Sequence, residues 1–211
     1  MEKVITRRRV LQGAGCAIAA AFPSLRLIGG QSASPVSAIM SKLSAYMAAA
    51  SGRALPGNVV ENAKQHILDT FAAMISGSEL PPGRGALQFV RAYGGKEVAT
   101  VVASNIVCGP IEAALANGVL AHADETDDSH GPSRSHPGVS VVPAALAAGE
   151  QYVVSGTHFL RAVTLGYDVG TRVTMSMGGP AYQAATHRST HGTVAVFAAG
   201  AAAGCAASLR A

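Results

Sequence analysis

Hydrophobic residues recur at intervals of three and four along most of the chain after residue 34, and this spacing predicts amphipathic helices. The pattern predicts one helix over residues 34–52 and a second that starts at Pro56 and stops at Gly77. Further helices are expected at 87–93, 111–122, 141–153, 155–175 and 187–209. Residues 98–102 form the one convincing β-type run, and a loop is expected at 175–185. The pattern therefore predicts an all-α fold.

Two of these helices have unusual sequences. Pro143 is expected in the first turn of its helix. Proline has no backbone N–H, and beyond the first turn that N–H is needed for a helical hydrogen bond. Residues 192–209 are eighteen residues without a charge, which is long enough for a membrane span. Alanine and glycine make up most of this stretch and contribute little transfer free energy, so we expect a helix buried on all sides and no stable membrane span.

The first 33 residues differ from the rest of the chain. A basic stretch precedes an apolar run of about ten residues, as in an export leader. The sequence from Thr6 to Leu11, TRRRVL, resembles a twin-arginine signal. We expect residues 1–33 to be a cleaved leader that directs the protein to the periplasm. The alternatives are an amphipathic N-terminal arm and, if the leader is not functional, a cytoplasmic protein.

Composition indicates a globular protein with a core of small side chains. Hydrophobic residues make up 49% of the chain and charged residues 13%, which excludes intrinsic disorder. The chain has 24 glycines and no tryptophan, so we expect helices that approach one another closely. Cys108 and Cys205 stand in apolar surroundings and are expected to be buried thiols.

The positive charge of the chain comes from its leader. The first 33 residues contain five basic residues and one acidic residue, and 11 of each sign follow. The remainder is neutral and has no basic stripe, so nucleic acid is not an expected partner.

Titratable residues concentrate between residues 116 and 150. Between its two apolar segments this stretch carries three histidines and four carboxylates, namely His122, His130, His136, Asp124, Glu125, Asp127 and Asp128. Prolines and glycines among them predict a shaped loop between two helices. Acids alone are explained by helix capping, but capping does not require imidazoles. The histidines therefore favour a functional loop.

The order of motifs resembles the MmgE/PrpD family, which includes 2-methylcitrate dehydratases and cis-aconitate decarboxylases. The resemblance rests on NG at 117–118, AH at 121–122, ETDDS at 125–129, HPG at 136–138, PAALA at 143–147 with Glu150, GYDV at 166–169 with Arg172, and HRSTHGT at 187–193. It extends over residues 35–211 and implies that residues 34–211 are the family's N-terminal helical domain.

Some features depart from the family pattern. Glu125 and Thr126 stand where the family has an aspartate and an aromatic residue. Either His187 or His191 can match the family histidine, and we favour His191. Family members are about twice as long and carry an α/β lid with a lysine and a tyrosine, which implies that this chain is truncated. Its lysines after the leader, Lys42, Lys64 and Lys96, lie far from the loop in the sequence.

The resemblance implies a lyase that removes water or carbon dioxide from a small di- or tricarboxylic acid. Such chemistry needs a base, an acid and donors for the carboxylates, but no metal or organic cofactor. The expected catalytic residues are His136, His191, Glu125, Asp127, Asp128 and Ser129. The expected substrate-binding residues are His122, His130 and His187. Expected protein partners are a second copy in a homodimer and a separate lid-bearing chain.

Two other function classes remain open on the sequence. His122, Glu125, Asp127 and His136 together form an N/O ligand set for a metal-dependent enzyme, although no fixed ligand spacing supports it. In the second class, the chain is a truncated, non-catalytic helical module that dimerises or binds a partner.

Overall fold

The computed structural model describes residues 37–211, and the expected leader at 1–33 lies outside this range. The described part is mostly helical, as predicted. Its helices are α2 (Ala38–Ala50), α3 (Gly57–Ser78), α4 (Pro81–Tyr93), α5 (Pro110–Ala121), the 3-10 turn η1 (Gly131–Ser133), α6 (Gly138–Gln151), α7 (Gly156–Ser176), α8 (Pro180–Thr186) and α9 (Thr190–Ala206). Two short strands, β1 (Ala99–Thr100) and β2 (Val107–Cys108), pair antiparallel.

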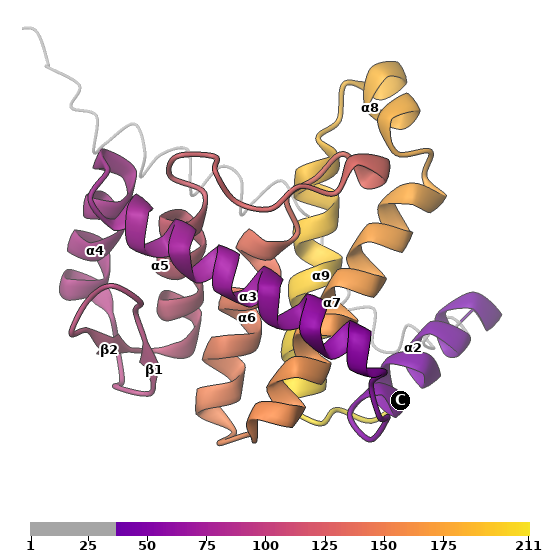
Figure 1. The fold of residues 1–211 in the computed structure, drawn as a ribbon, viewed down its shortest axis with the longest axis horizontal. Coiled ribbons are helices and arrows are strands. Elements are labelled where there is room, and N and C mark those ends of the chain that lie inside the picture. Colours follow the sequence, from indigo (N-terminus) through magenta and orange to yellow (C-terminus); the bar gives the residue numbers. More distant parts are fainter. Residues whose placement is uncertain (1–36) are drawn as a thin grey trace, which may run out of the picture. The chain divides into compact units, whose positions relative to one another are not determined.

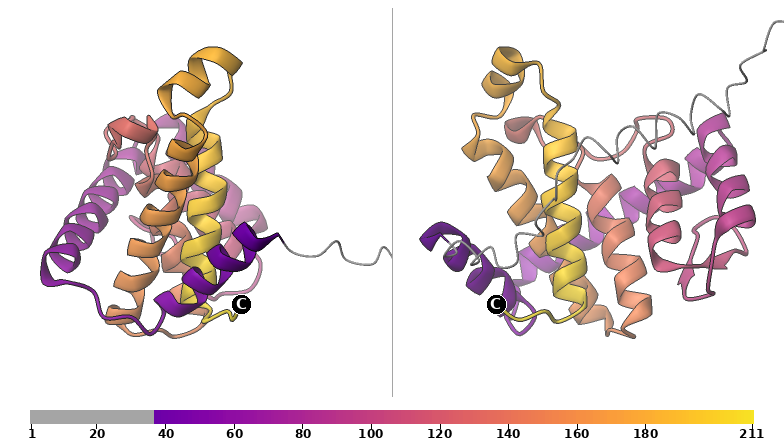
Figure 2. Two further views of the ribbon diagram at one scale, coloured as in Figure 1. Left: turned by 90° about the vertical axis from the view of Figure 1, so that its right-hand side faces the viewer. Right: turned by 180° about the vertical axis from the view of Figure 1, so that it is seen from behind.

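Helix α6 has neighbours on several sides. It packs on α5, α7 and α9, and α7 packs along α9. Helix α3 contacts α5, α6 and α7, and Figure 1 shows it crossing them. Figure 2 shows α9 from behind, beside α6 and α7. The loop between α5 and α6 therefore joins two adjacent helices of the core.

Small residues line the contact between α7 and α9. Ala162, Ala198 and Ala202 are fully buried there. A Cβ added to Gly170 of α7 would lie 2.6 Å from the Cβ of Ala198, so the two helices approach too closely for a larger residue. This packing confirms the predicted small-residue core. Cys108 and Cys205 are also buried and unbridged, as expected.

The expectation that the last helix is buried on all sides is wrong. One side of α9 packs on α6 and α7, but Val196 and Phe197 on the other side are 72% and 42% exposed. The helix starts at Thr190 instead of residue 187, because the Ser189 side chain caps it by accepting a hydrogen bond from the Gly192 N–H. Among the described residues, no helix is long and apolar enough to cross a membrane.

Other elements also depart from the prediction. Helix α4 starts six residues early, at Pro81, since proline suits the first turn of a helix. Helix α8 occupies part of the expected loop at 175–185. Helix α6 starts at Gly138, so Pro143 lies in its second turn. The carbonyl oxygen of Val139, four residues earlier, receives no helical hydrogen bond from Pro143, because proline has no backbone N–H. A Cβ on Gly118 would lie 3.2 Å from this oxygen, so α5 approaches α6 closely here.

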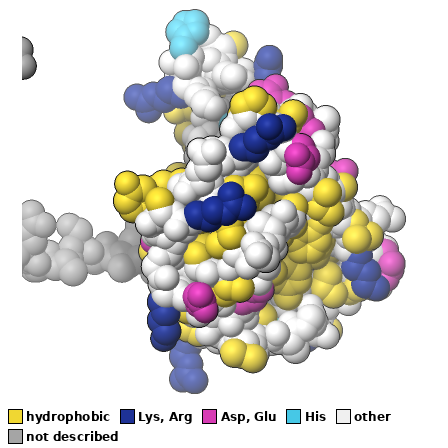
Figure 3. Space-filling view, turned by 90° about the vertical axis from the view of Figure 1, so that its left-hand side faces the viewer, with side chains coloured by type: hydrophobic (Ala, Val, Ile, Leu, Met, Phe, Trp, Pro, Cys, Tyr) yellow, Lys and Arg dark blue, Asp and Glu magenta, His cyan; other side chains and the backbone are white. Residues whose placement is uncertain are grey.

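Exposed hydrophobic side chains also lie on the α4 side of the protein. Phe89 and Tyr93 of α4 are 42% and 71% exposed, and their rings lie 5.5 Å apart. Figure 3 views this side and shows hydrophobic side chains between charged ones.

Candidate active site

Asp127 is the centre of the loop between α5 and α6. Its side chain is fully buried between two histidines. The Nδ1 atom of His122, the residue that caps α5, lies 3.1 Å from Oδ1. The Nδ1 atom of His136, two residues before α6, lies 3.2 Å from Oδ2, but the two are not aligned for a hydrogen bond. One buried carboxylate thus faces the same ring nitrogen of two imidazoles.

His191 adds a third imidazole from the first turn of α9. Its ring stacks on that of His136 with the centroids 4.9 Å apart, while the His122 and His136 rings are 5.6 Å apart. Burial lowers the pKa of His191, and the positive charges that His136 and His122 can carry lower it further. His191 is therefore disposed to be neutral, as a proton acceptor must be.

Neighbouring acids shape the loop around this cluster. Asp124 accepts hydrogen bonds from the hydroxyls of Ser76 and Thr126, and these bonds lower its pKa. The next residue, Glu125, is exposed, with a φ of 54° in the left-handed region. Its negative charge acts against the lowering of the His191 pKa. Ser129 is exposed on the same loop.

Asp128 faces a different direction from Asp127. Its Oδ1 accepts a hydrogen bond of 2.8 Å from the N–H of Gly138, and its Oδ2 accepts one of 2.7 Å from the hydroxyl of Tyr167. The Nδ1 atom of His66 lies 3.2 Å from Oδ2. Asp128 therefore connects the loop to α3 and α7.

His130 contacts the turn around η1, and His187 is exposed. The Nδ1 atom of His130 lies 2.7 Å from the hydroxyl oxygen of Ser133, which is itself 2.7 Å from that of Ser135. These contacts close the turn around η1. His187 is exposed at the end of α8 and has a φ of 56°.

The sequence of residues 41–211 matches the MmgE/PrpD N-terminal domain. The chain belongs to the MmgE/PrpD family. The predicted resemblance is thereby confirmed, as is the fold class, since the described part is the helical domain of this family with one small two-stranded sheet.

Similar MmgE/PrpD proteins are named after cis-aconitate. The chain is 33% identical over 132 residues to the cis-aconitate decarboxylase-like protein oryM of Aspergillus oryzae, a match that covers 59% of this chain and 27% of the relative. It is 28% identical over 130 residues to the cis-aconitate decarboxylase of Aspergillus terreus, with 59% and 26% covered. The human cis-aconitate decarboxylase is 31% identical over 124 residues, with 56% and 26% covered. The matched part thus spans about a quarter of each relative.

The structure brings together four of the residues predicted for the MmgE/PrpD site, namely His122, Asp127, His136 and His191. Glu125 and Ser129 are exposed on the same loop, and His187 is exposed at the end of α8. Asp128 and His130 make their contacts outside the cluster. The functional roles assigned to all nine residues stay predictions.

Neither His66 nor Tyr167 is a predicted site residue on the sequence alone. Tyr167 lies 39 residues after Asp128, and its only signal is its place in the GYDV block of the resemblance. His66 lies on α3 and has no local motif.

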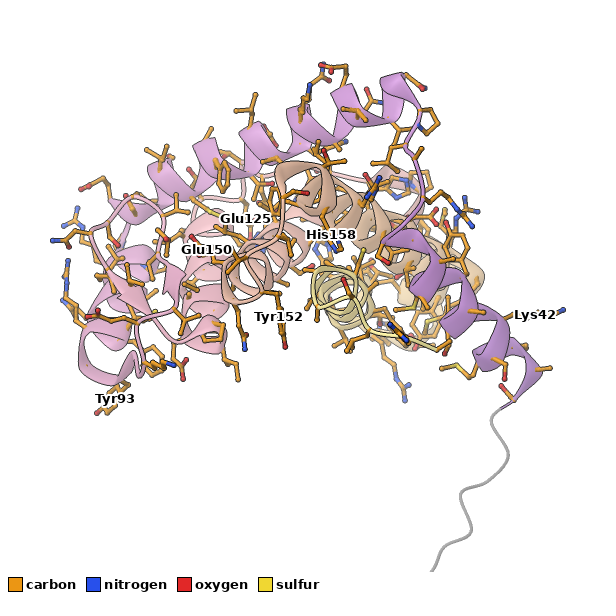
Figure 4. All side chains as sticks on the ribbon, turned by 90° about the horizontal axis from the view of Figure 1, so that it is seen from below. Lys42, Tyr93, Glu125, Glu150, Tyr152 and His158 are labelled. Atoms are coloured by element: carbon orange, nitrogen blue, oxygen red, sulfur yellow. The ribbon has the colours of Figure 1, made fainter. Side chains whose placement is uncertain are left out.

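The described residues form no metal-binding group at the histidine cluster. Within residues 37–211, no group of three or more His, Cys, Asp or Glu side chains is arranged to hold a metal ion. The metal-enzyme hypothesis therefore gains no support from the geometry. Figure 4 shows Lys42 extending from α2 away from the neighbouring helices.

Proposed function

We propose that this domain contributes the proton-transfer groups of a lyase that acts on a small di- or tricarboxylic acid. The observation that carries the proposal is the buried Asp127 carboxylate shared by His122 and His136, with His191 stacked on His136. The chain belongs to the MmgE/PrpD family and is similar to proteins named as cis-aconitate decarboxylases, and this similarity supports a small carboxylic acid as the substrate.

The cluster has the groups that the reaction needs. His191, with its lowered pKa, accepts the proton from the carbon next to a substrate carboxylate. In a dehydration, His136 then gives a proton to the departing hydroxyl, which leaves as water. In a decarboxylation no C–H proton is removed: the bond to the carboxylate breaks, carbon dioxide leaves, and His136 protonates the carbanion that keeps the electron pair. Because His122 and His136 turn Nδ1 toward Asp127, their Nε2 atoms are available to contact the substrate.

The cluster is partly open to solvent. The side chains of His122 and His136 are 41% and 22% exposed. Water near these groups weakens the electrostatic stabilisation of a developing enolate. We therefore propose that turnover is slow in this chain alone and rises when a lid-bearing chain covers the loop.

An assay of cis-aconitate and 2-methylcitrate consumption, with and without the remaining part of a relative as a separate chain, tests this function. His136→Ala should lower turnover by about 10²-fold or more, because it removes a general acid. His158→Gln, which removes an imidazole that contacts the carbonyl oxygen of Cys205, is the control and should leave turnover unchanged. Unchanged turnover in His136→Ala would rule out the assigned role.

We also propose export to the periplasm, on the basis of the paired Arg7 and Arg8 ahead of an apolar run. Replacing both arginines with lysine should keep the protein in the cytoplasmic fraction. An unchanged distribution between the cell fractions contradicts the proposed leader.

A further inference from the structure

Asp127 and Asp128 both act on His136, but at different atoms. Asp127 faces the imidazole ring of His136. Asp128 holds the backbone two residues later, where its Oδ1 accepts the N–H of Gly138 at 2.8 Å. The direction of the His136 side chain therefore depends on where Asp128 itself is fixed.

Asp128 is fixed from outside the loop. The hydroxyl of Tyr167 on α7 donates a 2.7 Å hydrogen bond to Oδ2, and Nδ1 of His66 on α3 lies 3.2 Å from the same oxygen. The His66 and Tyr167 rings also contact each other, with centroids 4.9 Å apart. The Asp128 side chain is 7% exposed, so little water competes for its oxygens.

The backbone at Gly138 is packed closely against this group. A Cβ at this position would lie 2.6 Å from Oδ1 of Asp128, 2.6 Å from the Thr70 hydroxyl oxygen and 2.8 Å from the Tyr167 hydroxyl oxygen. A displacement of Tyr167 or Asp128 therefore changes the support of the first residue of α6, and with it the position of His136.

We propose that Tyr167 and His66 are positioning residues that act through Asp128 on the Gly138 backbone and so set the position of the His136 imidazole. The inference rests on the proposed function for its catalytic meaning. Neither residue belongs to the histidine cluster around Asp127.

Tyr167 is suited to this role at any physiological pH. Burial raises its pKa, and the neighbouring Asp128 carboxylate raises it further. The phenol stays protonated and remains a hydrogen-bond donor. His66 is 46% exposed, so it provides a weaker second contact than the buried phenol.

Tyr167→Phe tests the proposal, with Tyr46→Phe as a matched control. Tyr46 donates a 2.6 Å hydrogen bond to Asp168, so the control removes the same type of bond to an aspartate of α7, the helix that carries Tyr167. Two NMR signals report on the site without any substrate. They are the hydrogen-exchange rate of the Gly138 N–H and the imidazole Cε1–H cross-peak of His136.

Tyr167→Phe should raise the Gly138 exchange rate on the order of fivefold, the effect of one lost hydrogen bond, and should move the His136 cross-peak. Tyr46→Phe should change neither. A folded Tyr167→Phe protein with both signals at their wild-type values overturns the proposal. If Tyr167→Phe does not fold, His66→Gln decides by the same two signals, with smaller changes expected.

Titration of each variant with cis-aconitate separates the inference from the proposed function. Tyr167→Phe should weaken binding while Tyr46→Phe leaves it unchanged. A wild-type chain that binds no acid contradicts the proposed function, whereas the Gly138 and His136 signals still decide whether Tyr167 positions the loop.

Discussion

Asp127 is the central residue of the site, because its buried carboxylate lies 3.1 Å from Nδ1 of His122 and 3.2 Å from Nδ1 of His136. The positive charges that His136 and His122 can carry act, together with burial, against protonation of His191, which stacks on His136. A histidine held neutral in this way is suited to accept a proton.

The lowered pKa of His191 predicts a loss of stability in acid. The unfolded chain binds a proton at this residue near the ordinary histidine pKa of about 6.5, whereas the native chain binds it at a lower pH. The free energy of unfolding should therefore fall as pH drops below about 6.5 toward the native pKa. His191→Gln should show a smaller fall than wild type in chemical denaturation at pH 7.5 and pH 5.

His187→Gln is the control for this measurement, since it removes an exposed histidine. It should retain the wild-type dependence on pH. A fall of equal size in wild type and His191→Gln would show that His191 is not the residue whose protonation opposes folding.

The sequence predicted which residues gather at the loop better than the direction of each side chain. Histidines among acids indicated a proton-transfer site, and His122, Asp127, His136 and His191 do lie together. The sequence predicts one catalytic role for Asp127 and Asp128 alike, but the irregular backbone turns the Asp128 side chain toward α3 and α7. Such a reversal depends on local φ and ψ angles, which no periodic pattern specifies.

At the scale of elements, helix packing through small residues positions the cluster. Helix α9 supplies His191, and its place against α7 is set by the close approach of Gly170 and Ala198. Spacing of hydrophobic residues predicted most helices, but it missed the first turns of α4 and α6. Proline and glycine occur there, and these residues mark loops as often as helix starts.

Two glycine substitutions test this packing. Gly170→Ala should lower the free energy of unfolding by about 1–3 kcal/mol, because its methyl group would overlap Ala198. Gly200→Ala on α9 should raise it by up to about 1 kcal/mol, because alanine favours helix and nothing lies within 4 Å of the new methyl group. Denaturation of both variants measures the difference. Equal effects would contradict the close approach of α7 and α9.

At the scale of the whole molecule, the exposed side of α9 supports the expected homodimer. Val196 and Phe197 leave a hydrophobic surface on a helix whose other side is buried, and such surfaces often mark interfaces. Phe197→Glu should raise the dimer dissociation constant about tenfold or more in analytical ultracentrifugation. Tyr93→Glu on α4 is the control and should leave association unchanged. A monomeric wild type, or a Phe197→Glu protein that associates as wild type does, contradicts this interface.

Binding of a tricarboxylic acid at the histidine cluster is the central claim, and an NMR titration with cis-aconitate tests it most directly. The Cε1–H signals of His122, His136 and His191 should shift together with one dissociation constant. The signal of His158, which contacts the carbonyl oxygen of Cys205 at 2.7 Å, should not move. Cluster signals that stay in place, or that move no more than that of His158, would contradict binding at the cluster.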